Sequence, residues 1–149
     1  MRKLLHQIDL PPLWLALFAA AGWLLARLLP LPFVQSRPIG AVLVVMGVLL
    51  MAAALIQMVL RRTSFVPRRD PSALVTGGAF ALSRNPIYLA DALILAGLLL
   101  WWDGIAALWL VPAFMLFIAR RFIAGEEARI AARFGPEWRS YATRTRRWL

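Results

Sequence analysis

Two short polar stretches interrupt a chain that is otherwise rich in apolar side chains. The first contains Thr76-Gly77-Gly78 and Arg84-Asn85-Pro86, and the second, about forty residues later, is Glu126-Glu127. Glycine lets a ligand approach backbone N–H groups closely, and arginine can hold a carboxylate through two donors. Paired carboxylates suit a cation or a ribose diol. The first stretch therefore favours an anionic group, and the second a cationic or hydroxyl-bearing group.

A single ligand would use all of these groups if it carried a carboxylate, an ammonium, a ribose and a sulfonium, as S-adenosylmethionine does. Each feature also has a simpler structural explanation. Gly77-Gly78 can form an ordinary turn, and Asn85-Pro86 can begin a helix, with asparagine as the N-cap and proline in the first turn. Glu126-Glu127 can pair with Arg120 or Arg129. Both explanations remain open from the residues alone.

Asp91 is a carboxylate inside an apolar segment, about 9 Å beyond Asn85 at about 1.5 Å per helical residue. A carboxylate in a membrane costs about 2.5–3.5 kcal/mol on insertion scales and tends to be functional. An interfacial residue paired with a nearby arginine is the alternative. If a helix extends back to Asn85, Arg84 and Asp91 can share a face.

Composition excludes several classes of site. The chain has 149 residues, 62% of them hydrophobic, with no cysteine and one histidine, His6. Disulfides, thiolate metal sites and cysteine nucleophiles are therefore ruled out, and the sequence predicts no metal site. The net charge is +10. Because the arginines flank apolar runs instead of forming one face, we attribute this charge to membrane topology and expect no nucleic-acid partner.

Four apolar segments predict an all-α, multi-pass membrane bundle that forms a single domain over residues 1–149. A bilayer core of about 30 Å needs roughly 20 apolar residues in a helix. The third segment is short for this thickness, so we expect a tight hairpin with the fourth that thins the membrane or stops short of the far face. The predicted transmembrane helices cover residues 11–29, 39–60, 86–102 and 104–122.

The distribution of positive charge predicts the orientation. All of the 17 lysines and arginines except Arg27 and Arg37 lie in the N-terminus, the 61–85 loop or the tail after Ala119. Positive loops stay inside, so we expect both termini in the cytosol and place the protein in a bacterial inner membrane. Arg2 and Lys3 before an apolar run are also typical of a signal peptide, but this run is long, and we expect an uncleaved first helix.

Residues 125–149 predict a cytosolic amphipathic tail. We expect helices over 126–134 and 137–143, separated by Gly135-Pro136, with Trp138 and Tyr141 side by side in the second helix. A basic tail that lies on anionic headgroups is the simpler alternative. The paired glutamates argue against it, because an anionic surface would repel them.

The order and spacing of these motifs resemble the isoprenylcysteine carboxyl methyltransferase family, and membrane phospholipid methyltransferases share much of the pattern. The resemblance implies S-adenosylmethionine bound by the C-terminal half, capped by the tail, and a lipophilic acceptor that enters from the bilayer. Well-known members have histidine where this chain has Asn85, so a histidine general base is excluded here. The matching residues are Gly77, Gly78, Arg84, Asn85, Pro86, Ile87, Tyr88, Glu126, Glu127, Phe134, Gly135, Trp138, Tyr141 and Arg146.

We therefore predict an S-adenosylmethionine-dependent membrane methyltransferase acting on an isoprenylcysteine-like carboxylate or an amine head group. A four-helix transporter with Asp91 as its binding carboxylate and a membrane scaffold are the rival hypotheses. The expected catalytic residues are Arg84, Glu127 and Asp91, with Arg84 and Asp91 on either side of the methyl-transfer point. Asp91 or a glutamate would accept the proton that an amine acceptor must lose, whereas a carboxylate acceptor needs mainly orientation. The expected cofactor contacts are Gly77, Gly78, Ala79, Leu82, Arg84, Asn85, Pro86, Tyr88, Glu126, Glu127 and Tyr141.

Overall fold

A computed structural model describes residues 10–63 and 71–149. Arg2, Lys3 and His6, and part of the predicted 61–85 loop, lie outside these residues. The described part is helical, apart from loops and an isolated bridge between Leu31 and Gly104. The elements are α2 (Pro11–Leu28), α3 (Ser36–Leu60), α4 (Ala79–Leu82), α5 (Pro86–Trp101), the 3₁₀ turn η1 (Ile105–Ala107), α6 (Leu110–Ile118), the π-helical turn η2 (Ala119–Ile123) and α7 (Ala124–Arg144).

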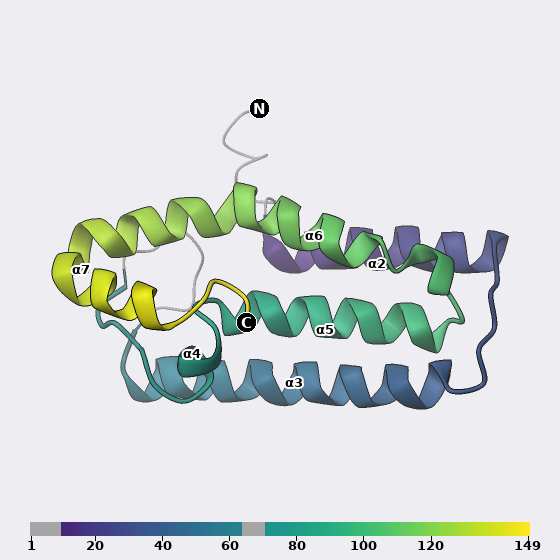
Figure 1. The fold of residues 1–149 in the computed structure, drawn as a ribbon, viewed down its shortest axis with the longest axis horizontal. Helices are drawn as coiled ribbons and strands as arrows, with labels where there is room; N and C mark the ends of the chain where they lie inside the picture. Colours follow the sequence, from purple (N-terminus) through teal and green to yellow (C-terminus); the bar gives the residue numbers. More distant parts are fainter. Residues whose placement is uncertain (1–9, 64–70) are drawn as a thin grey trace.

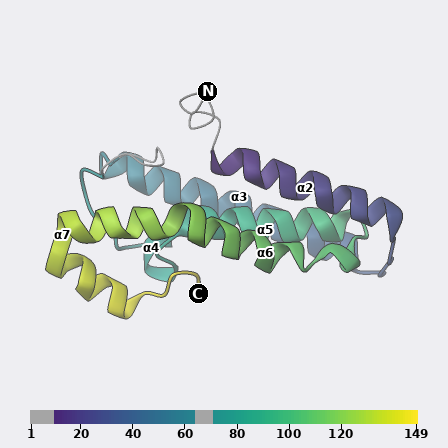
Figure 2. The same cartoon turned by 90° about the horizontal axis from the view of Figure 1, so that it is seen from above.

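The long helices run up and down in an antiparallel bundle, with α5 near its centre (Figures 1 and 2). Helix α5 contacts α2, α3, α4, η1 and α6. The connections from α2 to α3 and from α5 to η1 lie at one end of the bundle, and α4 and the fold of α7 lie at the other (Figure 1). The two polar stretches of the sequence therefore meet at one end.

Glycines allow α3 to lie close against α5. A Cβ on Gly40 would come within 2.6 Å of the Gly97 carbonyl oxygen, and a Cβ on Gly97 would meet the Gly40 oxygen at the same distance. A Cβ on Gly47 would lie 2.9 Å from the carbonyl oxygen of Ala90. Small residues that bring backbones together are the usual way for helices to associate in a membrane, where apolar burial between helices gives little drive.

On the opposite side, α5 packs against α6 and α2 through large side chains. Leu95, Leu99, Phe114 and Ile118 are fully buried there. The Phe18 ring of α2 meets Phe114 edge-on, with centroids 5.3 Å apart. The outer faces of α2 and α3 are lined instead by exposed leucine, valine and methionine, as expected for surfaces that face lipid.

Within the described residues, three helical segments are long and apolar enough to cross a membrane: Pro11–Leu28, Ser36–Leu60 and Ile105–Arg144. Helix α5 has only 16 residues, about 24 Å at about 1.5 Å per residue, less than a core of about 30 Å. The short third segment is thus confirmed, while the count of four complete spans stays a prediction.

The fourth apolar segment differs from its predicted form at both ends. Its α-helix begins at Leu110 after η1, so Pro112 falls in the first turn, where no intrahelical N–H bond is lost. At the other end, the fourth helix was predicted to end at residue 122 and the tail helix to begin at residue 126, whereas η2 carries the helix directly into α7. A single glycine costs a helix only about 1 kcal/mol, too little to end one that is packed on α5.

The predicted stop at Gly135-Pro136 is confirmed as a kink. Gly135 has φ 47° and ψ −112°, a conformation that glycine reaches easily, and α7 continues beyond it in a new direction (Figure 1). The second half carries Trp138 and Tyr141, whose rings lie 5.7 Å apart as the i, i+3 spacing predicts. The kink therefore folds the second half of α7 back toward the start of α5.

At the end of the bundle opposite α4, Asp103 links the α5–η1 connection, to which it belongs, with the α2–α3 connection. Its carboxylate accepts hydrogen bonds from Ser36 Oγ at 2.6 Å and Arg37 Nη2 at 3.0 Å. Its backbone oxygen accepts a bond from the Leu31 N–H at 3.2 Å. The hydrogen bond from Ser36, with a further contribution from Arg37, lowers the pKa of the Asp103 carboxyl. These contacts hold the α2–α3 connection and the α5–η1 connection together.

Candidate functional site

The site is built around the entry to α5. Proline has no N–H and a fixed φ, which suits the first helical position, and α5 begins at Pro86. Asn85 occupies the predicted cap position, but its side chain makes no capping bond, so that part of the prediction is wrong. Its Nδ2 instead reaches the Arg147 carbonyl oxygen at 3.3 Å and Glu127 Oε1 at 3.5 Å. Tertiary partners for the amide have replaced the local cap.

Glu127 is the centre of the cluster. Its Oε1 lies 3.2 Å from Arg84 Nε, and its Oε2 accepts a 2.5 Å hydrogen bond from Arg147 Nη2. The side chains of Glu127 and Arg84 are 12% and 16% exposed, so this contact is largely shielded from water. Although close in distance, the buried Arg84 Nε is not aligned for a hydrogen bond with any described residue. Glu127 thus pairs with arginines distant in sequence, not with Arg120 or Arg129.

Glu126 is held separately by Tyr88. The Tyr88 hydroxyl donates a 3.0 Å hydrogen bond to Glu126 Oε1. One turn before Glu126, the ring of Phe122 lies 6.5 Å from the Tyr88 ring. The aromatic contact and the hydrogen bond together fix the start of α7 against the start of α5. The two glutamates, expected to act as a pair, therefore have different partners.

The folded-back half of α7 closes the other side of Arg84. Arg84 Nη1 donates to the Ala142 carbonyl oxygen at 3.2 Å, and its guanidinium carbon lies 5.6 Å from the centre of the Trp138 ring. The Tyr141 hydroxyl donates to the Phe80 carbonyl oxygen at 2.6 Å. Tyr141 therefore lies beside Arg84, where this hydrogen bond joins it to α4. Its expected contact with the cofactor stays a prediction.

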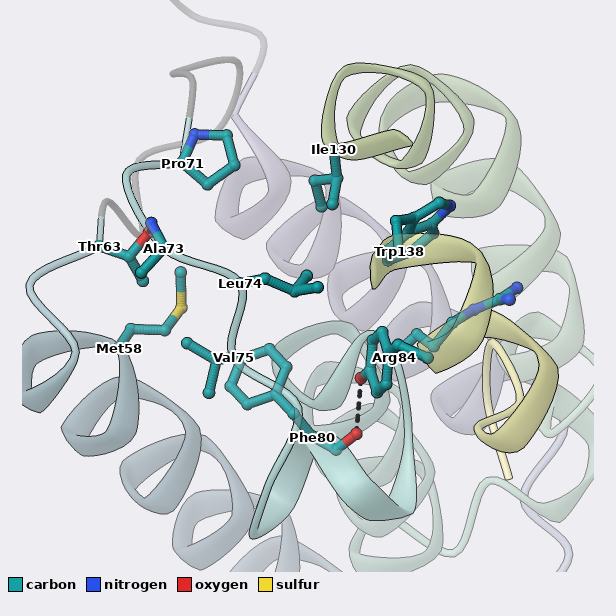
Figure 3. A pocket seen from close by; sticks show the side chains of 11 residues that line it. Met58, Thr63, Pro71, Ala73, Leu74, Val75, Phe80, Arg84, Ile130 and Trp138 are labelled. Atoms are coloured by element: carbon teal, nitrogen blue, oxygen red, sulfur yellow. Dashed lines mark hydrogen bonds between the residues drawn. The ribbon is translucent and has the colours of Figure 1, made fainter. Parts of the chain in front are cut away.

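Beside Arg84 lies a cavity of about 70 Å³ with a mainly apolar lining (Figure 3). Met58 at the end of α3, Leu74 and Val75, Phe80 of α4 and Trp138 of α7 contribute to it. Arg84 lines the cavity and also contacts Glu127. The arginine therefore connects an apolar cavity with a cluster of charged groups.

Three other predicted cofactor contacts, Gly77, Gly78 and Leu82, differ in their surroundings. Gly78 has φ 58°, and a Cβ there would overlap the Gln57 side chain, whose Oε1 accepts a 3.2 Å bond from the Ala79 N–H. Gly78 is thus explained by the turn itself. A Cβ on Gly77 would meet nothing within 4 Å in the part of the chain that the structure describes, as an open backbone requires. Leu82 is 63% exposed, and neither glycine lines the cavity.

Asp91 does not join the cluster. It is 5% exposed within α5, and no hydrogen bond or ion pair in the described part of the chain connects it to Arg84, Glu126 or Glu127. The predicted shared face required a helix that reached back to Asn85. Ser83 is extended and α5 starts at Pro86, so Arg84 lies outside the helix that carries Asp91. The two residues therefore do not share a helix face, and their expected places on either side of a methyl-transfer point stay a prediction.

Arg147, Ser83 and Gln57 were not predicted from the sequence. In the sequence, Gln57 is a polar side chain in an apolar segment, and Arg147 belongs to a basic end. For Arg147 the sequence carries no distinguishing signal, because arginines surround it. Arg146, a motif match, contributes its backbone oxygen to the Arg84 N–H at 2.9 Å while its side chain is exposed.

Comparison with known proteins adds a family to this geometry. A family model described as phospholipid methyltransferase matches residues 36–137, which include both polar stretches. An uncharacterized protein from Haemophilus influenzae is 42% identical over 64 residues, which are 42% of this chain and all of that relative. No solved structure matches. The matched range ends just before Trp138, so the folded-back half of α7 lies beyond it.

Proposed function

Because the chain belongs to the phospholipid methyltransferase family, we propose that it transfers a methyl group from S-adenosylmethionine to a lipophilic acceptor in the membrane. The observation that supports this proposal most is the contact between Arg84 and Glu127. It joins the two motifs that carry the family resemblance at one end of the bundle. The site also lies where the shorter helix α5 begins, next to surfaces that face lipid.

The charges of the residues at the site are complementary to the charges of the cofactor. Arg84 offers a buried cation beside an apolar cavity with aromatic rings, and Glu126 and Glu127 offer carboxylates at its other side. The cavity, about 70 Å³, is smaller than pockets of about 300–1,000 Å³ that enclose drug-sized ligands. We infer that it takes one portion of the molecule, and that the remainder lies along Arg84 and the two glutamates.

The residues have distinct roles in this proposal. The cofactor supplies a methyl group on a positively charged sulfur. Arg84 holds a carboxylate, either of the cofactor or of an acidic acceptor, and Glu126 or Glu127 holds a cation or a ribose diol. Asp91, buried deeper in α5, takes the proton from an amine acceptor. Asn85 orients groups by hydrogen bonding alone, because an amide side chain neither gains nor loses a proton near neutral pH.

Two acceptor classes fit these roles. An isoprenylcysteine-like carboxylate would neutralise the sulfonium charge during transfer, and orientation would then limit the rate. An amine head group would need a base, for which the buried Asp91 is available. A buried carboxylate is also what a transporter would use, but the match to a methyltransferase family argues against that alternative.

Calorimetric titration with S-adenosylhomocysteine, the demethylated product, tests the proposal on detergent-purified protein. We expect binding and a rise in thermal stability with ligand concentration. Arg84→Lys keeps the charge but removes the bidentate donor set, so it should weaken binding while preserving the fold. Arg139→Gln, a change at an exposed arginine of α7, is the matched control and should bind as the parent does. Absence of binding by the parent at millimolar ligand would overturn the proposal.

A further inference from the structure

Residues 145–148, which follow α7, run along the entry to α5, and we call them the strap. The Arg84 N–H donates to the Arg146 carbonyl oxygen at 2.9 Å. The Ser83 hydroxyl donates to the Arg147 carbonyl oxygen at 3.0 Å, and Asn85 Nδ2 donates to the same oxygen at 3.3 Å. Each residue of the turn before α5 therefore has a hydrogen bond to the strap.

The strap is anchored at both ends by burial. Thr145 is buried, and its N–H donates to the Tyr141 carbonyl oxygen at 3.0 Å. Trp148 packs against the apolar core that α5 shares with α6. The backbone of the strap is therefore held in place independently of the Arg147 side chain, which lies between Thr145 and Trp148.

Arg147 contacts Glu127 with two nitrogens. Nη2 donates to Oε2 at 2.5 Å, and Nε donates to Oε1 at 3.3 Å, a side-on pairing that fixes the plane of the carboxylate. The hydrogen bond with Glu127 raises the pKa of the Arg147 guanidinium. Arg147 is 40% exposed whereas Arg84 is 16% exposed. Glu127 is thus held between an outer arginine and an inner arginine.

The inner contact depends on the outer one. Glu127 Oε1 is near Arg84 Nε but not aligned with it for a hydrogen bond. The two donors of Arg147 therefore hold the carboxylate at the shorter distances, and Asn85 Nδ2 adds a longer bond of 3.5 Å. If Glu127 turned away, Arg84 would lose its counter-charge while remaining at the edge of the cavity. A buried cation without a partner is costly and would reorient or draw in water.

We propose that Arg147 is a positioning residue of the methyl-transfer site, acting through Glu127 to hold the Arg84 guanidinium at the edge of the cavity. The strap then forms one wall of the site, and its backbone carbonyls orient Arg84 and Asn85. This inference rests on the proposed function. It separates Arg147 from the other arginines of the basic tail, which serve topology.

A double-mutant cycle on S-adenosylhomocysteine affinity tests this role. The variants are Arg147→Gln, Glu127→Gln and both together, titrated by calorimetry with unfolding temperature measured in parallel. Residues in one hydrogen-bonded network couple, so Arg147→Gln should weaken binding by roughly tenfold in the parent and by much less in Glu127→Gln. Arg144→Gln is the control, because Arg144 is exposed and, among the described residues, bonds only within its own helix, to the Ser140 oxygen.

The outcomes separate the two claims. Absence of binding by the parent overturns the proposed function, whereas a binding parent with equal affinity in Arg147→Gln, or with additive effects in the double variant, overturns the positioning role alone. If Arg147→Gln does not fold, Arg147→Lys decides, because lysine keeps the charge without the side-on pair. Weaker binding at a parent-like unfolding temperature supports the proposal, and parent-like binding overturns it.

Discussion

Tyr88 and Glu126, the third residues of α5 and α7, are joined by a hydrogen bond of 3.0 Å from the phenol to the carboxylate. The Tyr88 ring packs near Phe122, so its apolar body lies in the core and its hydroxyl points to the polar end. This residue marks the level at which the apolar bundle gives way to the candidate site. It also sets the register between the two helices that carry the motifs.

Tyr88→Phe keeps the ring and removes the donor. Because hydrogen bonds to charged groups contribute about 1.5–3 kcal/mol, we expect a clear fall in unfolding temperature and weaker product binding. Tyr141→Phe is the comparison, since its hydroxyl donates to a neutral backbone oxygen and should cost about 1 kcal/mol. Equal losses in the two variants would show that the Glu126 carboxylate gives the Tyr88 bond no extra strength.

The two neighbouring glycines should respond differently to alanine. At Gly78, a positive φ and the overlap with Gln57 predict a loss of about 1–3 kcal/mol on Gly78→Ala. At Gly77 a Cβ meets nothing, so Gly77→Ala should leave the unfolding temperature unchanged. If Gly77→Ala nevertheless weakens product binding, its backbone lies close to the ligand. A stable Gly78→Ala protein would show that the turn can rearrange.

Asp91→Asn separates chemistry from cofactor binding. The residue is buried in α5 and makes no contact with Arg84 or the glutamates among the described residues, so product affinity should remain at the parent level. Turnover should fall, and more for amine than for carboxylate acceptors, because only the amine must lose a proton. Activity assays with both acceptor classes measure this. Undiminished turnover with every acceptor would make Asp91 a structural residue.

Acid should loosen the far end of the bundle through Asp103. Ser36 and Arg37 lower its folded-state pKa, so its contribution to stability is complete above the unfolded value of about 3.9 and is lost as pH falls through the folded value. The difference in unfolding temperature between the parent and Asp103→Asn should therefore shrink below about pH 4. A difference that stays constant from pH 7 to pH 3 would contradict this linkage.

Reporter fusions test the predicted orientation. Arg37 lies at the end of the bundle that carries Asp103, and α7 folds at the opposite end (Figure 1). Positive charge gathers with α7, so a reporter after Leu149 should read cytosolic and one at Arg37 should read external. A fusion within α4, at Ala81, should agree with Leu149. Matching signals from Arg37 and Leu149 would require a different number of crossings.

Local rules in the sequence predicted much of the helical framework. Apolar runs located α2, α3, α5 and the segment that contains α6, Pro86 located the start of α5, and Gly135-Pro136 located the kink in α7. These features depend on propensity, periodicity and backbone geometry, which act over a few residues. The continuous passage from α6 to α7 was missed, because Gly125 weakens a helix by less than tertiary packing on α5 restores.

The sequence by itself thus determined a helical membrane protein with two polar motifs, and the family resemblance that the matched residues 36–137 confirmed. Only the tertiary structure decided which charges meet. Glu127 had arginines nearby in sequence, yet the contact between the starts of α7 and α5 and the return of the strap brought Arg84 and Arg147 to it. Because of the same geometry, the Asn85 side chain bonds Glu127 and the Arg147 backbone instead of capping α5. Such contacts depend on helix crossing and chain return, which the spacing of residues along one helix does not encode.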